Sequence, residues 1–128
     1  MTEKEMMKRT KSFALRVMKV VDALPRNASG RAIGGQLVRS GTSVPANYRA
    51  ACRGRSKAEF IAKLGIVEEE ADESALWLEL IMEGGLLKER LVRDLHIEAG
   101  EITAIVSASR KTARARLQIE NRKSKIAN

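Results

Sequence analysis

The stretch "SGTSVPANYRAACRGRSKAEF", Ser40 to Phe60, decides how this chain folds. It begins with small residues around Pro45 and then turns basic. We expect a helix over about residues 32–53 that is kinked at Pro45, because proline removes one backbone hydrogen bond. A break of the helix at Val44 is the alternative. The apolar residues that place one face of this helix in the core are Ile33, Leu37, Val44, Tyr48 and Ala51.

The end of the same stretch opens the next helix. Ser56 and Glu59 have the spacing of a capping box, in which the hydroxyl and the carboxylate each accept a hydrogen bond from an early backbone N–H. We expect this helix to run over residues 57–83 and to end at Gly84 and Gly85.

Apolar stripes on both sides predict two more helices. One stripe stops at Pro25 and predicts a helix over about residues 4–24, and the other predicts a helix over about residues 88–116. Strand-like alternation is absent from the sequence. The predicted fold class is therefore all-α: an antiparallel up-down four-helix bundle in one domain of residues 1–116, followed by a basic frayed tail over 117–128.

The composition excludes several kinds of site. The 128 residues suit one domain, and a single cysteine and a single histidine favour neither a disulfide nor a zinc site. The glycines of "GRAIGG", Gly30 to Gly35, lack the Lys and Ser/Thr of a phosphate-binding loop, and no set of residues resembles a catalytic triad. No catalytic residue, metal or cofactor is predicted.

The sequence also argues against a membrane protein. No apolar run approaches the roughly 20 residues of a membrane span, and the first residues lack the apolar centre of a signal peptide. We expect a cytoplasmic protein with no membrane contact.

Charge is distributed unevenly along the chain, whose net charge is +8. Between residues 26 and 63, eight Lys and Arg meet one acid; between 64 and 109, eleven Asp and Glu meet three bases. After residue 109, seven bases meet one acid. Such segregation favours a polyanionic partner, and nucleic acid in particular.

The arginines of the helix over 32–53 lie opposite its apolar stripe and form a row. Each can neutralise a phosphate and make binding salt-dependent, whereas aromatic residues are too scarce for stacking of unpaired bases. The alternative is that these arginines pair with acids of the helix over 57–83, within or between subunits. The candidate nucleic-acid-binding residues are Arg31, Arg39, Arg49, Arg53, Arg55, Lys57, Lys63, Arg110, Lys111, Arg114 and Arg116.

The helix over 57–83 has more apolar residues than the surface of a monomer would accept. Some of them project away from the stripe that faces the core, and exposed apolar patches mark interfaces. The acids beside them are interpreted as a solvated face or as partners of a neighbouring subunit's arginines; a metal site or acid–base catalysis is the weaker hypothesis. The candidate oligomer-interface residues are Ile66, Glu69, Glu70, Glu73, Trp77 and Leu80.

The segment from Gln36 to Ile81 resembles the bacterial four-helix-bundle family of proteins encoded by intervening sequences in 23S ribosomal RNA genes. The pattern Ser-x-x-Ser-x-Pro-Ala-Asn carries the resemblance. The family often continues with Ile-Ala-Glu-Gly, whereas Tyr-Arg-Ala-Ala follows here, so a role of that glutamate does not transfer. The family-motif structural residues are Ser40, Ser43, Pro45 and Asn47.

The resemblance implies a subunit that assembles as a homopentamer. A protein related in fold, the accessory variability protein of diversity-generating retroelements, is a basic pentamer that works with a reverse transcriptase and nucleic acid. Residues and resemblance together predict a non-enzymatic oligomeric nucleic-acid-binding accessory protein that contacts the RNA or DNA backbone through a basic face. The alternative is a structural or protein-interaction module, such as a scaffold for a reverse transcriptase, whose arginines form intersubunit salt bridges.

Overall fold

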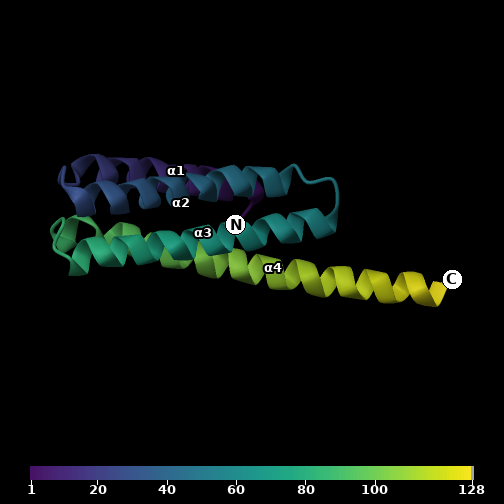
Figure 1. The fold of residues 1–128 in the computed structure, drawn as a ribbon. Coiled ribbons are helices and arrows are strands. Elements are labelled where there is room, and N and C mark those ends of the chain that lie inside the picture. Colours follow the sequence, from purple (N-terminus) through teal and green to yellow (C-terminus); the bar gives the residue numbers. More distant parts are fainter. Residues whose placement is uncertain (128) are drawn as a thin grey trace.

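The structure is a computed structural model that describes residues 1–127, which form four α-helices and no strand. In chain order these are α1 (Glu3–Ala23), α2 (Ala28–Cys52), α3 (Lys57–Glu83) and α4 (Arg93–Ala127), with a short 3-10 helix η1 (Glu89–Leu91) before the last. Each helix runs antiparallel to the preceding one, so the chain forms an up-down four-helix bundle (Figure 1).

Side-chain caps begin the first three helices where the sequence supplies a hydroxyl or an amide. Thr2, Asn27 and Ser56 each accept a hydrogen bond from the backbone N–H three residues later, at 2.8–3.1 Å. The cap at Asn27 starts α2 at Ala28, four residues before the expected start. The return half of the capping box is displaced by one residue, because the Glu59 carboxylate accepts from the N–H of Arg55 and not from that of Ser56.

Helix α2 continues through Pro45 without interruption, so the alternative of a break at Val44 is wrong. The kink expected at Pro45 stays a prediction. Gly41 lies one turn before Pro45 and lets α1 approach α2 closely, since a Cβ on Gly41 would lie 2.7 Å from a methyl group of Val17. The close approach of α1 to α2 therefore depends on the absence of a side chain at Gly41.

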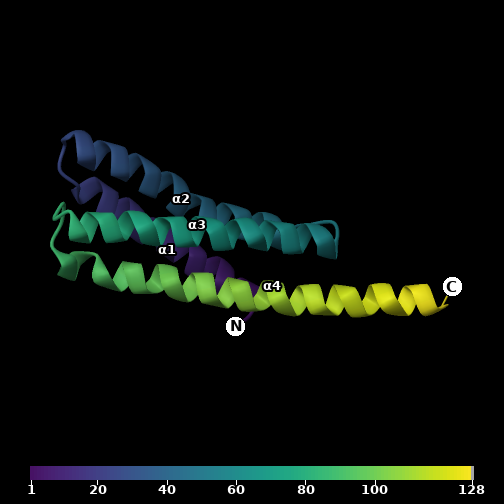
Figure 2. The same ribbon diagram turned by 60° about the horizontal axis from the view of Figure 1, so that its bottom comes forward.

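The core lies along the inner stripes of all four helices. Phe13, Leu37, Leu64 and Ile102 are fully buried, one from each helix. Residues of this size each contribute roughly 1.5–3 kcal/mol when fully buried. Helix α2 packs along α3, which packs along α4, whereas α1 meets α4 over a much shorter seam (Figure 2).

Helix α4 differs from the prediction at both ends. It begins at Arg93 because η1 takes up part of the expected first turn, and it remains helical to Ala127, so the frayed tail expected over 117–128 is wrong for the described residues. Seven of the twelve residues over 117–128 are Leu, Gln, Glu, Arg, Lys or Ala, which favour helix, and no Gly or Pro follows Gly100. Its last turns project past the rest of the bundle (Figures 1 and 2). Asn128 lies outside the described residues.

Candidate nucleic-acid interface

The register between the helices gathers basic residues at one end of the bundle. Three contacts fix that register: Gly41 against Val17, the Ser40 hydroxyl 2.8 Å from that of Ser74, and Arg110 2.8 Å from Glu68. On this basis residues 1–12, 46–68 and 109–127 share one end, which we call the basic end. It carries sixteen Lys and Arg against five Asp and Glu, whereas the rest of the chain carries eight against eleven.

The arginine row of α2 is exposed as predicted from the helical pattern, but its members have different partners. Arg39 bonds to Glu70 at 3.1 Å and to Glu73, both on α3 of the same chain. Arg31 lies eighteen residues before Arg49 and hence about 27 Å from it along the helix. Arg31 and Arg39 therefore lie outside the basic end.

Arg49 and Arg53 are exposed at the end of α2, and neither forms an ion pair within residues 1–127. Arg55 is exposed in the turn that follows, and Lys63 is half-buried on α3. Lys57, at the start of α3, pairs with Glu120 of α4. The ion pair between Lys57 and Glu120 shows that the start of α3, next to the turn after α2, lies beside the projecting part of α4.

The α4 candidates also divide into paired and unpaired groups. Arg110 is half-buried and bonds to Glu68 at 2.8 and 2.9 Å. Lys111, Arg114 and Arg116 are exposed, with no ion pair among the described residues. Arg110 consequently ties α4 to α3, while the three that follow face solvent.

Three lysines of α1 were not among the predicted nucleic-acid-binding residues. Lys4, Lys8 and Lys11 are all exposed and lie opposite the buried stripe of α1. Their i, i+4, i+7 spacing is visible in the sequence, but it is the register of α1 against α2 that puts them at the same level of the bundle as Arg49 and Arg53.

The candidate interface residues of α3 are only partly exposed. Leu80 is 40% exposed, and Leu76, one turn earlier and not predicted, is 46% exposed. Trp77 and Ile66 are half-buried; Trp77 packs against the core cluster and its indole N–H donates to Glu73 at 3.3 Å. Helix α2 covers this flank, which is why the wheel position overestimated the exposure of Trp77.

The acids on this side of α3 also differ from one another. Glu70 and Glu73 are engaged by Arg39 within the chain, whereas Glu69 is exposed without an ion pair among the described residues. Of the predicted acids, only Glu69 is therefore available to a neighbouring subunit without breaking an ion pair.

Of the family-motif residues, Ser40 is buried between helices, whereas Ser43, Pro45 and Asn47 are half-buried. Ser40 is fully buried and shares a hydrogen bond with Ser74, while each also bonds to a carbonyl of its own helix. The Asn47 side chain donates to the carbonyl oxygen of Ser43 at 2.9 Å, one turn back across Pro45. Their contacts are structural, and none of them faces an open site.

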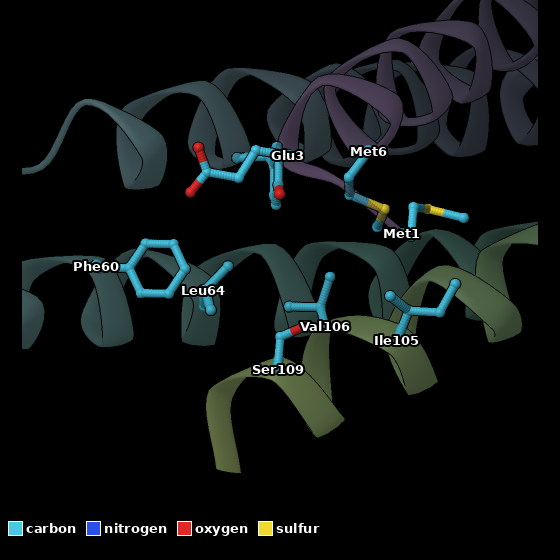
Figure 3. A pocket seen from close by; sticks show the side chains of 9 residues that line it. Met1, Glu3, Met6, Phe60, Leu64, Ile105, Val106 and Ser109 are labelled. Atoms are coloured by element: carbon cyan, nitrogen blue, oxygen red, sulfur yellow. The ribbon is translucent and has the colours of Figure 1, made fainter. Parts of the chain in front are cut away.

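A cavity of about 140 Å³ lies between the start of α1 and the facing turns of α3 and α4. Figure 3 shows Glu3 and Met6 of α1 on one side, with Phe60 of α3 and Ser109 of α4 opposite. The single histidine, His96, lies outside this lining, at 3.9 Å from Glu79. In the described part of the chain, no group of three His, Cys, Asp or Glu is arranged to hold a metal ion.

Two local environments shift pKa values near the basic end. A two-pronged hydrogen bond from Arg9, at 2.7 and 2.8 Å, lowers the pKa of the Glu98 carboxyl, and the same bond raises the pKa of Arg9. Burial raises the pKa of both the Tyr48 hydroxyl and the Cys52 thiol. Cys52 is thus protonated and inert at neutral pH, as expected for a packing residue.

The model of the 23S rRNA-intervening sequence protein family matches residues 2–108. The chain belongs to this family. The match includes the Ser40–Asn47 motif, and the projecting part of α4 lies beyond it. A crystal structure of a protein of unknown function from the S23 ribosomal protein family of Bacteroides thetaiotaomicron is similar, with 29% sequence identity and a TM-score of 0.80. The likeness covers 87% of this chain and 99% of that one.

A search of the curated proteins finds no match. Over the residues described, none of the helices combines the length and the apolar character that crossing a membrane requires.

Proposed function

We propose that this chain is a non-enzymatic, cytoplasmic accessory protein that binds nucleic acid through the phosphates of its backbone. One observation carries the proposal: three segments far apart in the sequence converge to give an end of the bundle with sixteen Lys and Arg against five acids. Of these bases only Arg9, Lys57 and Arg110 have ion pairs within residues 1–127. A concentration of unpaired cations of this kind attracts a polyanion and releases its counterions on binding.

The test is a titration of a labelled hairpin RNA, followed by fluorescence anisotropy from 50 to 300 mM salt. We expect the logarithm of the affinity to fall linearly with the logarithm of the salt concentration, with a slope near −1 for each phosphate contacted. The matched control is the double variant Lys88→Gln with Arg90→Gln, which removes two exposed bases at the opposite end of the bundle. This variant should bind the RNA as the wild type does. Absence of binding at 50 mM salt, or binding indifferent to salt, would exclude the proposal.

We further propose that the subunit assembles as a homopentamer through the outer face of α3, around Leu76 and Leu80. Two large side chains 46% and 40% exposed on neighbouring turns support an interface there. Glu69, exposed on the same face, supplies a charge that a partner's base can meet.

The alternative function, a structural or protein-interaction module, is supported by the pairing of Arg39 with Glu70 and Glu73. In that case Arg49 and Arg53 would pair with carboxylates of a neighbouring subunit, and the assembly would be a scaffold for a partner such as a reverse transcriptase. An Arg49→Gln chain that fails to assemble, as judged by light scattering, would favour this alternative over nucleic-acid binding.

A further inference from the structure

Within the basic end, five exposed cations lie on the outer sides of α1 and α2. They are defined by exposure, by the absence of an ion pair within residues 1–127 and by their position on adjacent helices, and we call them the α1–α2 patch: Lys4, Lys8, Lys11, Arg49 and Arg53. We infer that this patch is the principal phosphate site and that its ligand is a double-helical polynucleotide, not an unpaired strand. This inference rests on the proposed function and specifies its site and its ligand.

The dimensions of the patch follow from helix geometry. At a rise of about 1.5 Å per residue, Lys4 and Lys8 are about 6 Å apart along α1 and Lys8 and Lys11 about 4.5 Å. Since Met6 of α1 and Tyr48 of α2 line the same cavity, Arg49 and Arg53 lie at the same level of the bundle as the first turns of α1. The three lysines therefore span about 10 Å along α1, and the two arginines span about 6 Å along α2.

Charge density favours a duplex on such a patch. A double helix presents about one phosphate per 1.7 Å of its axis, twice the density of one strand. A short patch reaches more phosphates on a duplex than on a flexible strand. The two rows, one on each helix, also provide a surface that two neighbouring backbone segments can meet.

The aromatic residues argue against an unpaired strand. Proteins that hold single strands stack the bases on exposed aromatic rings. Phe13 is fully buried and Tyr48 is 7% exposed, while Phe60 is half-buried in the lining of the cavity. Trp77 packs against the core cluster, beyond the basic end. All four Phe, Trp and Tyr residues of the chain are thereby accounted for, and none offers a stacking face beside the patch.

The immediate surroundings of the patch do not neutralise it. Glu5 and Glu3 are the acids of the first turn of α1. Glu3 lines the cavity between the helices, and neither carboxylate forms an ion pair with a patch residue. Arg9, which shares these turns, is turned toward α4 and bonds to Glu98 and Glu101.

The experiment compares two double variants with the same loss of charge from the same two helices. Lys8→Gln with Arg49→Gln removes two patch cations, and Lys19→Gln with Arg31→Gln removes two exposed cations outside it. The probes are a labelled 20-base-pair RNA duplex, a DNA duplex of the same sequence, an oligouridine of equal length and vesicles containing phosphatidylserine. Circular dichroism verifies that both variants fold as the wild type does.

We expect the wild type to bind both duplexes at least about tenfold more tightly than oligouridine at equal salt. The patch variant should lose about two units of salt slope on the duplexes, one for each phosphate contact removed, while the control variant keeps the wild-type slope. Equal or tighter binding to oligouridine, preference for the vesicles, or equal losses in the two variants would overturn the inference. The proposed function would survive equal binding of duplex and single strand, and it fails if no nucleic acid binds or if the binding is indifferent to salt.

Discussion

The two halves of α2 carry the same kind of residue on the same outer face, and they use it differently. In the first half Arg39 faces Glu70 and Glu73 of α3, so its charge is satisfied within the fold. In the second half Arg49 and Arg53 form no ion pair within residues 1–127, although the facing first turns of α1 carry acids as well as lysines. What a surface arginine does therefore depends on the helix beside it, which helical spacing alone does not reveal.

The largest expected effect concerns assembly through α3. Glu70 and Glu73 are paired with Arg39 within the chain, so they are not free to meet a neighbouring subunit. We therefore expect the subunit interface to form around the exposed Leu76 and Leu80. The wild type should have a mass several times the 14.1 kDa of one chain, and Leu76→Glu with Leu80→Glu should reduce it to one chain, since the interface would bury unpaired charges. Light scattering after size exclusion measures this.

The control for assembly is Ile97→Glu, which places the same charge at an apolar residue 51% exposed on α4 and should leave the mass unchanged. A wild type with the mass of a single chain would refute the interface from the start. Trp77→Glu is less informative, since Trp77 packs against the core cluster and its loss would destabilise even a monomer.

The next effect concerns the close contact that fixes the first half of α2 against α1. Gly41→Val would place a side chain 2.7 Å from Val17, so we expect a loss of about 2–3 kcal/mol in the free energy of unfolding. Urea denaturation measures it. Gly35→Ala, where a Cβ meets nothing within 4 Å, should instead stabilise the chain by about 0.5–1 kcal/mol. Similar changes for the two variants would contradict the register on which the basic end depends.

A smaller effect concerns the seam between α1 and α4. The pKa of Glu98 is lower in the folded chain than the ordinary value of 4.5, so its bond to Arg9 stabilises the fold fully above that value. The stabilisation is lost as the pH falls through the lowered pKa. We expect Glu98→Gln to lower the free energy of unfolding by about 1 kcal/mol at pH 7. The variant should also lose less stability than the wild type when the pH falls below 4.5, whereas Glu69→Gln, at an exposed residue, should have neither effect. Thermal melts at pH 7, 4.5 and 3 measure this. If the melting temperatures of the wild type and Glu98→Gln changed equally with pH, the ion pair between Arg9 and Glu98 would not stabilise the fold.

Much of the fold is predictable because it is encoded locally. The Ser56 cap and the glycine pair at Gly84 specify the bounds of α3 to the residue, and the apolar stripes specify four helices. The Ser40 motif predicted the family. The helical continuation of α4 to Ala127 was missed because a basic composition was interpreted as fraying, although its residues favour helix.

The site is less predictable because it depends on register between helices. The row of α2 arginines is visible from spacing, but the pairing of Arg39, and which turns of α1 lie at the level of Arg49, depend on the offset between neighbouring helices. That offset is set by contacts such as Gly41 against Val17 and Ser40 against Ser74, which no single segment specifies. Exposure of Trp77 was misjudged for the same reason, since the helix wheel does not include the neighbouring helix.

The most direct test of the account is one affinity measurement on three chains: the dissociation constant for a hairpin RNA at 100 mM salt of the wild type, Arg39→Gln and Arg49→Gln. Each variant loses one exposed arginine from the same face of α2. We predict that Arg49→Gln weakens binding about fivefold and that Arg39→Gln changes it by less than about twofold. Equal weakening by the two variants, or a larger loss from Arg39→Gln, would contradict the account.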